Sequence, residues 1–151
     1  MVICGDGPSR NGPNICAGSP SLSTTRTPLI RNIDETPRTP VQMDGVQGAS
    51  MAVMVGRADG APHFALRQFA VEPGGHTPRH QHDYEHEVFV VSGEGTVFLG
   101  GRENPIRGGD VIYVPANEEH QFRSKQDQPG PLRFLCMVPI EQNCGGPVPG
   151  S

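Results

Sequence analysis

The chain has 151 residues, a formal net charge of −4 and one lysine, Lys125, beside eleven arginines that are scattered along its length. This distribution offers no basic stripe for a nucleic-acid backbone, so we expect no nucleic-acid partner. No stretch reaches the roughly eighteen apolar residues of a membrane span, and the N-terminal part lacks the continuous apolar segment of a secretion signal. We therefore expect a cytoplasmic protein without a membrane partner.

Residues 1–40 differ in composition from the rest of the chain, because they are rich in Gly, Pro, Ser, Thr and Asn and show no sustained hydrophobic period. We predict a flexible, disordered N-terminal segment at least as far as Thr27. An alternative for residues 29–41 is an arm that packs on a partner barrel. One domain is expected over residues 41–144, followed by a short C-terminal tail at residues 145–151.

Short apolar runs between turn residues predict an all-β domain, in keeping with the 20 glycines and 16 prolines of the chain. In chain order, the predicted strands cover residues 51–57, 64–71, 80–82, 86–91, 96–99, 111–114, 120–123 and 132–138. Short strands of this kind suit a small barrel. Because such a barrel buries limited surface, dimer formation through a sheet edge or through residues 29–50 would help its stability.

Two motifs carry four of the six histidines of the chain. The first motif reads Gly74-x5-His80-x-His82-x3-His86-x6-Gly93. Since strand side chains alternate between faces, His80 and His82 would share one face of an extended strand. The three residues between His82 and His86 give the chain room to turn, so that His86 can face this pair across a hairpin.

The second motif reads Gly109-x5-Pro115-x-Asn117-x2-His120-x3-Ser124. It combines a turn with a histidine at the start of the following strand. His120 would therefore supply a fourth nitrogen donor to the same point. Two independent spacings that converge in this way predict a metal site inside the barrel.

Together the two motifs resemble those of the cupin family, and the resemblance covers about residues 41–144. It implies a β-barrel, usually jelly-roll-like, whose single metal ion is held by two histidines and a glutamate from the first motif and one histidine from the second. In this chain His86 stands where glutamate is usual, Asn117 where glycine is usual, and Ser124 where asparagine is usual. Asparagine is one of the few residues that can adopt the left-handed conformation of a tight turn.

Within the family, the chain most resembles the small single-barrel cupins that have a four-histidine manganese site. Residues 69–75, 80–87 and 134–139 carry this resemblance, which also implies a homodimer. The predicted cofactor is one divalent transition metal per chain, with manganese the first choice and iron, copper, nickel, cobalt or zinc as alternatives. Its predicted ligands are His80, His82, His86 and His120.

Glu85 and Glu87 flank His86, but the three-residue gap selects His86, and alternation would point Glu87 away from the interior. Four neutral imidazoles leave a divalent ion its full charge, which makes the ion a stronger Lewis acid. In an octahedral arrangement, four protein ligands leave two positions open. The pattern therefore favours chemistry at the site over a closed structural role.

Three functions fit this site. The first is a metal-dependent oxidoreductase of the dioxygenase type that acts on a small organic substrate. The second is a Lewis-acid isomerase or lyase acting on a sugar or keto acid, which needs a proton carrier from among Tyr84, Tyr113, Glu118 and Glu119. The third is a module that binds a metal and a small ligand without turnover, because barrels of this kind host many activities.

Phe134 and Cys136 are candidate pocket residues, since alternation sends both side chains to the interior face of a late strand. Cys136 could instead be an inert core residue, or a group next to the metal ligands that is open to oxidation. Phe69 and Phe122 are expected in the core.

The remaining histidines and cysteines have no predicted part in the site. His63 and His76 fit neither ligand spacing, so we expect surface or core positions for them. Cys4, Cys16 and Cys144 lie in Gly/Pro-rich segments without CxxC spacing, which argues against a zinc knuckle.

Overall fold

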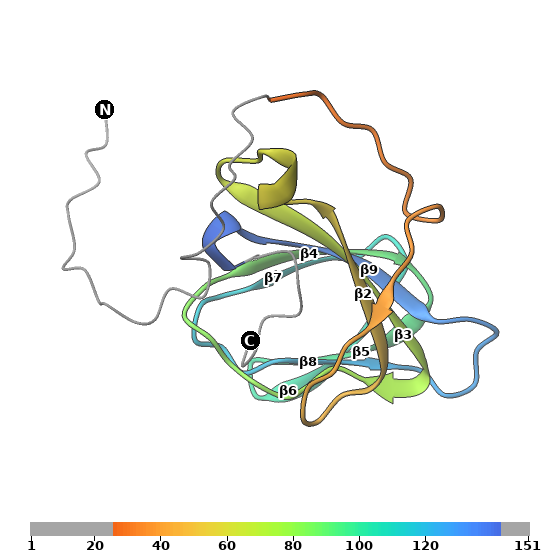
Figure 1. The fold of residues 1–151 in the computed structure, drawn as a ribbon. Helices are drawn as coiled ribbons and strands as arrows, with labels where there is room; N and C mark the ends of the chain where they lie inside the picture. Colours follow the sequence, from red (N-terminus) through yellow and green to blue (C-terminus); the bar gives the residue numbers. More distant parts are fainter. Residues whose placement is uncertain (1–25, 143–151) are drawn as a thin grey trace.

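The computed structural model describes residues 26–142, which form one curled antiparallel sheet (Figure 1). Its strands are β1 (Thr39–Pro40), β2 (Gln47–Val55), β3 (Phe64–His76), β4 (His86–Ser92), β5 (Glu94–Leu99), β6 (Arg102–Arg107), β7 (Val111–Val114), β8 (Gln121–Ser124) and β9 (Leu132–Pro139). Two short 3-10 helices are also present, η1 (Arg57–Asp59) and η2 (Ile140–Gln142). The predicted all-β class is confirmed.

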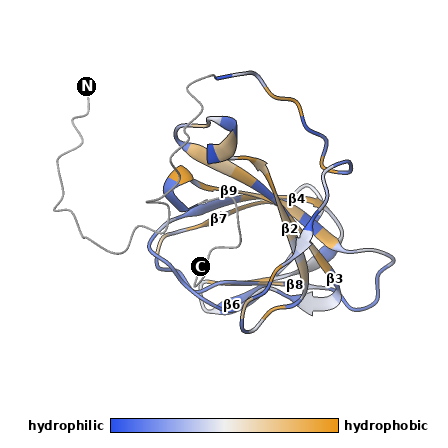
Figure 2. Cartoon of the chain, viewed as in Figure 1, coloured by the Kyte–Doolittle hydropathy of each residue, from blue (hydrophilic) through white to orange (hydrophobic). Residues whose placement is uncertain are grey.

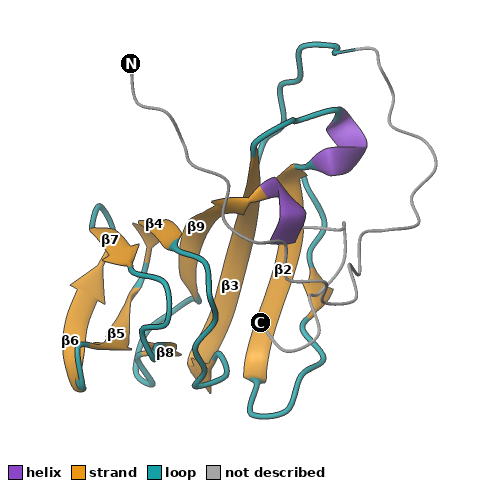
Figure 3. Ribbon diagram, turned by 90° about the vertical axis from the view of Figure 1, so that its left-hand side faces the viewer, coloured by secondary structure: helices purple, strands orange, loops and turns teal. Residues whose placement is uncertain are grey.

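The strand order along the sheet is β6-β5-β8-β3-β9-β4-β7, and β2 pairs with β3 and with β1. Curling of the sheet places β8, β5 and β6 opposite the layer that contains β9 and β4 (Figures 1 and 3). Strand β3 belongs to both layers. Its residues 64–71 pair with β9, whereas its last residue, His76, pairs with Arg123 of β8.

A bend in β3 makes this change of layer possible. The pairing with β2 passes from Val71–Ala49 to His76–Gln47, so residues 72–75 bulge opposite a single residue of β2. Gly75 is required in the bulge because a Cβ there would overlap the carbonyl oxygen of Gln47. The bend directs the chain after β3, which carries the first two motif histidines, toward β8.

The predicted strands agree with the structure at most positions. The prediction at residues 111–114 matches β7 in full, and those at 51–57, 64–71, 86–91, 96–99, 120–123 and 132–138 overlap β2, β3, β4, β5, β8 and β9. The predicted strand at residues 80–82 is wrong, because only the isolated bridge between His80 and His120 forms there. Pro78 has no amide hydrogen to extend that ladder, and the chain bends at residues 83 and 84.

The predictions missed β1 and β6. Strand β6 is joined to β5 by Gly100 and Gly101, whose φ angles are 64° and 74°. Two successive positive φ angles are typical of a two-residue hairpin turn, so this Gly-Gly pair was an available signal. Pro105 inside the following run obscured it, since proline is normally confined to edge strands such as β6.

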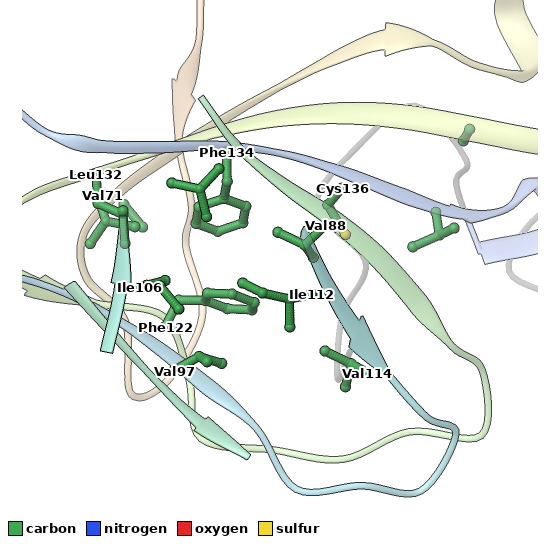
Figure 4. Close-up of a cluster of buried hydrophobic side chains, with 14 of the residues drawn as sticks. Val71, Val88, Val97, Ile106, Ile112, Val114, Phe122, Leu132, Phe134 and Cys136 are labelled. Carbon is green, nitrogen blue, oxygen red and sulfur yellow. The ribbon is translucent and has the colours of Figure 1, made fainter. Parts of the chain in front are cut away.

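Apolar side chains from both layers fill the interior (Figure 4). Along β9, Leu132, Phe134, Cys136 and Val138 are buried, whereas the residues between them are partly exposed. Phe134 faces Phe122 of β8, and their stacked rings have centroids 4.6 Å apart. Hydrophobic and hydrophilic residues are mixed along the strands (Figure 2), and buried and partly exposed residues alternate along β9. This alternation is the period-two pattern from which the strands were predicted.

The segment before the barrel packs on the outside of its own β2 and β3. Arg31 forms an ion pair with Asp59 at 2.9 Å and also donates a hydrogen bond to the carbonyl oxygen of Met54. The side chain of Gln68 donates to the carbonyl oxygen of Thr36 at 3.2 Å. Residues 31–40 therefore cover part of the sheet of the same chain.

Several predictions concern residues outside the described range of 26–142. They are the disorder of residues 1–25, the C-terminal tail at residues 145–151, and the roles of Cys4, Cys16 and Cys144. Within the described range, no helix is long and apolar enough to cross a membrane.

Candidate metal centre

The four motif histidines come together, with ring centroids of contacting pairs 4.5 to 5.3 Å apart. His80 and His82 lie in the connection between β3 and β4, His86 is the first residue of β4, and His120 immediately precedes β8. His80 and His120 exchange both backbone hydrogen bonds, with N–O distances of 3.2 and 2.9 Å. This bridge takes the place of the predicted strand and fixes the two motifs against each other.

Asn117 makes a second link between the motifs. Its φ of 65° lies in the left-handed region, as expected for a residue that replaces glycine in this turn. In this conformation its backbone amide donates to the carbonyl oxygen of His82 at 2.6 Å. The turn of the second motif therefore positions a histidine of the first.

Three imidazoles could hold a metal ion. One side-chain nitrogen from each of His80, His82 and His120 lies within 4.8 Å of the other two. The Nδ1 atoms of these rings contact the carbonyl oxygens of Pro78, Tyr84 and Glu118 at 3.0, 2.8 and 2.8 Å, respectively. A ring that donates through Nδ1–H keeps its lone pair on Nε2, so all three rings are held in the tautomer that binds a metal through Nε2.

His86 lies beside this group but is arranged differently. Its Nε2 is 2.7 Å from Nε2 of His82, and its Nδ1 is 3.2 Å from Sγ of Cys136. Since the lone pair of His82 is on Nε2, His86 donates to it and accepts from the thiol of Cys136. The structure thus brings the four predicted ligands together, but the mutually close set comprises three of them, and ligation by His86 stays a prediction.

Burial keeps these imidazoles neutral, which is the form that binds metals. It lowers the pKa of His86 to about 2 and that of His82 to about 4, with smaller contributions from the charges of Arg67 and the neighbouring histidines. Burial also lowers the pKa values of His80 and His120. The donor set therefore fits a transition metal at neutral pH without prior deprotonation.

The same effect predicts a loss of stability in acid for the metal-free protein. A histidine with a low pKa in the folded protein stays neutral there, whereas the same histidine in the unfolded chain binds a proton below about pH 6.5. Acid therefore favours the unfolded chain, and the free energy of unfolding falls as the pH falls. For His86 we expect a loss of about 2 kcal/mol between pH 7 and pH 5. Urea unfolding of the metal-free protein at both pH values measures this difference in the free energy of unfolding.

The matched variants are His86→Gln and His63→Gln. His86→Gln should remove this share of the pH dependence, because glutamine does not titrate. His63→Gln is the control, at an exposed position outside both motifs. An unchanged pH dependence in His86→Gln would contradict the prediction.

A cavity of about 70 Å³ adjoins the histidines. A single water needs only about 10–15 Å³, so the space suits a small organic molecule. Both candidate pocket residues, Phe134 and Cys136, line this cavity, and Phe69 and Phe122, which were expected only in the core, line it as well. The lining is therefore largely apolar apart from the histidines and one charged residue, Arg67.

Of the four candidate proton carriers, Tyr84 is the one that lines the cavity. Its ring stacks on that of His82, with centroids 3.8 Å apart. Tyr113 is 57% exposed on the outer face of β7. Glu118 accepts a hydrogen bond from the amide of Gly100, and Glu119 forms an ion pair with Arg79. Glu87, as expected, is exposed on the outer face of β4.

Sequence reasoning did not select Arg67. It lies in β3 between Ala65 and Phe69, both of which alternation places on the interior face. A charged residue at an interior position of a strand was the available signal. The role of this residue depends on the cavity, which no local sequence pattern predicts.

Comparison with known proteins identifies the family. The model of the Cupin domain matches residues 67–138, which contain both motifs. The chain belongs to the cupin superfamily. Among solved structures, this cupin is similar to the polyketide cyclase RemF from Streptomyces resistomycificus, with a TM-score of 0.69 and 28% identity over 76% of this chain and 80% of that chain. A cupin 2 domain-containing protein from Halorhodospira halophila is 38% identical, with a TM-score of 0.58 and coverage of 62% and 65%.

Two of the relatives bear on the function of the site. The 1-methylthio-D-xylulose 5-phosphate methylsulfurylase of Rhodospirillum rubrum is 36% identical over 78 residues, which are 52% of this cupin and 49% of that enzyme. The oxalate-binding protein of Thermotoga maritima is 29% identical over 115 residues, or 73% of this cupin and 92% of that protein. This cupin therefore matches about half the length of the methylsulfurylase and nearly all of the oxalate-binding protein.

Proposed function

We propose that this cupin binds one divalent transition metal per chain, manganese by preference, and is an oxidoreductase of the dioxygenase type that acts on a small organic substrate. The observation that carries the proposal is the arrangement of His80, His82 and His120, whose Nδ1 atoms are tied to carbonyl oxygens. His86 is the proposed fourth ligand. When bound, the metal would supply redox chemistry, because so few protein ligands leave coordination positions open.

The chain's own residues would position the substrate and limit access of water. Phe69, Phe122 and Phe134 line the cavity with apolar surface beside the histidines. For His86 to bind the metal through Nε2, its Nδ1–H would donate to Sγ of Cys136, and this contact would fix the orientation of the ring, as partners of metal-ligating histidines commonly do. No strong base other than the histidines lines the cavity among residues 26–142, which suits a reaction whose difficult steps occur at the metal.

Tyr84 favours a second candidate function, a Lewis-acid isomerase or lyase acting on a sugar or keto acid. Such a reaction needs a group that carries a proton. The phenol of Tyr84 lines the cavity next to His82 and is the one candidate carrier in that position.

A third candidate is binding without turnover. The relative from T. maritima, almost all of which this cupin matches, is named for oxalate binding. Because function belongs to the site and not to the barrel, a metal-containing binding module is consistent with the same geometry.

Oxygen uptake tests the proposal and separates it from its alternatives. The untagged protein would be purified without added metal or chelator, analysed for metals by mass spectrometry, and then assayed with a panel of small organic compounds. Substrate-dependent oxygen uptake supports the oxidoreductase, and product formation without oxygen supports the Lewis-acid enzyme. Saturable binding with neither supports the binding module. A protein that neither contains nor takes up metal would contradict both enzyme proposals.

We also propose a cytoplasmic homodimer. The support is an apolar outer face on β4 and β7, where Phe89, Val111 and Tyr113 are 45%, 76% and 57% exposed. Strand β7 is also an edge of the sheet, and exposed edges are commonly covered by a partner. Sedimentation equilibrium measures the mass, and a monomer at micromolar concentration would contradict the dimer.

A further inference from the structure

Arg67 places a positive charge inside the barrel. The residue is 6% exposed and lines the cavity together with His80, His86 and His120. Arginine side chains are charged in proteins, because their guanidinium group is not deprotonated. The cavity therefore has a fixed positive charge that does not depend on a metal.

This charge has no anionic partner within residues 26–142. None of the ion pairs among these residues includes Arg67, and its Nε atom is buried without a hydrogen-bond partner. Its remaining contacts are weak ones. Nη2 lies 3.5 Å from Sγ of Cys136, and the guanidinium carbon lies 5.2 Å from the ring centroid of Phe69.

The contact with Cys136 does not replace an ion pair. It is a single long contact of 3.5 Å to Nη2 of Arg67, and the same sulfur lies 3.2 Å from Nδ1 of His86. A buried charge is normally paired or hydrogen-bonded, so an unpaired guanidinium that faces a cavity indicates that its partner is a ligand.

Three phenylalanine rings define the rest of that ligand. The rings of Phe69 and Phe134 stack with centroids 5.1 Å apart, and the rings of Phe122 and Phe134 stack with centroids 4.6 Å apart. Apart from the Arg67 guanidinium, which lies over the ring of Phe69, this cluster offers apolar surface. A cavity of about 70 Å³ limits the size of the molecule that can lie between them and the histidines.

We infer that the substrate is a small organic anion, whose charged oxygens bind the Arg67 guanidinium while its apolar part contacts the phenylalanines. This inference rests on the proposed function, because it names the substrate class of the same site. Arginine suits this role, since its planar fork of donors matches a carboxylate. Arg67 would thus orient the substrate relative to the metal ligands.

Binding of benzoate and of its neutral analogue benzamide to the purified full-length protein, measured by calorimetry, tests the inference. Loss of charge-assisted hydrogen bonds in Arg67→Met should weaken benzoate binding about 10- to 100-fold. Benzamide binding should weaken less, by no more than about fivefold, because a neutral amide oxygen forms a weaker hydrogen bond with the guanidinium group than a carboxylate does. The control Arg123→Met, at an exposed position on β8, should change neither affinity. Butyrate and butyramide repeat the comparison with a smaller apolar part.

Two readouts separate this result from misfolding and from loss of the metal. If Arg67 is a ligand-binding residue, the ligand-free Arg67→Met variant should have a Tm equal to or higher than that of the wild type, since a buried unpaired charge is removed. A lowered Tm would instead indicate a structural role and overturn the inference, as would benzoate binding that is absent in the wild type or unaffected by Arg67→Met. Metal content is measured in the same samples, so a protein without metal that still prefers benzoate would contradict the proposed function alone.

Discussion

Replacing His120 with alanine is expected to lower the affinity of the protein for its transition metal by more than about 100-fold. The reason is geometric, because His120 is one of the three imidazoles whose nitrogens lie within 4.8 Å of one another. Losing the partner of a ligand already costs about 10- to 100-fold, and losing a ligand itself should cost more. Mass spectrometry of the purified protein and titration against a chelating dye measure this change.

The comparison with His86→Ala shows how many of the four histidines contribute to metal affinity. His86 lies outside the close set and contacts His82 and Cys136, so we expect a smaller loss, of about 10-fold. His63→Ala is the control, because His63 is exposed and distant from both motifs in the sequence. Equal losses for His86→Ala and His120→Ala would show four equivalent ligands. Unchanged metal content in His120→Ala would reject the site.

Loading the metal-free protein with manganese is expected to raise its Tm by about 10 °C. An ion that binds only the folded state adds about 4 kcal/mol of stability when its concentration is 1,000 times the dissociation constant. For a domain of this size, each kcal/mol shifts the Tm by about 3 °C. The effect should be large because the ion would join His80 and His82, which precede β4, to His120, which precedes β8.

Thermal unfolding followed by circular dichroism, with and without manganese, gives the shift. His120→Ala is the matched variant, and its Tm should no longer respond to the metal. A magnesium control separates specific binding from general effects of a divalent cation, since imidazole suits transition metals better than magnesium. If no transition metal tested changes the Tm of the wild type, this result would contradict the proposed metal centre.

Local patterns predicted the elements whose residues alternate between the interior and the surface. The prediction at residues 111–114 matched β7 because Ile112 and Val114 are buried whereas Val111 and Tyr113 are exposed. The left-handed conformation of Asn117 also followed from residue type and motif position. Where pairing is not periodic, the predictions failed, since residues 80–82 contribute one bridge and no strand.

The sequence by itself determined the all-β class, the cupin motifs and the four histidines near one another, because strand alternation and motif spacing are properties of neighbouring residues. Only the tertiary structure decided which three of those histidines form the mutually close set and which one lies beside it. The bend in β3 and the bridge between His80 and His120 bring three nitrogens together and turn His86 toward Cys136. Likewise, the proposed role of Arg67 depends on the curled sheet, which buries its charged side chain beside the cavity. Such contacts join residues that are far apart in the chain, so no local pattern encodes them.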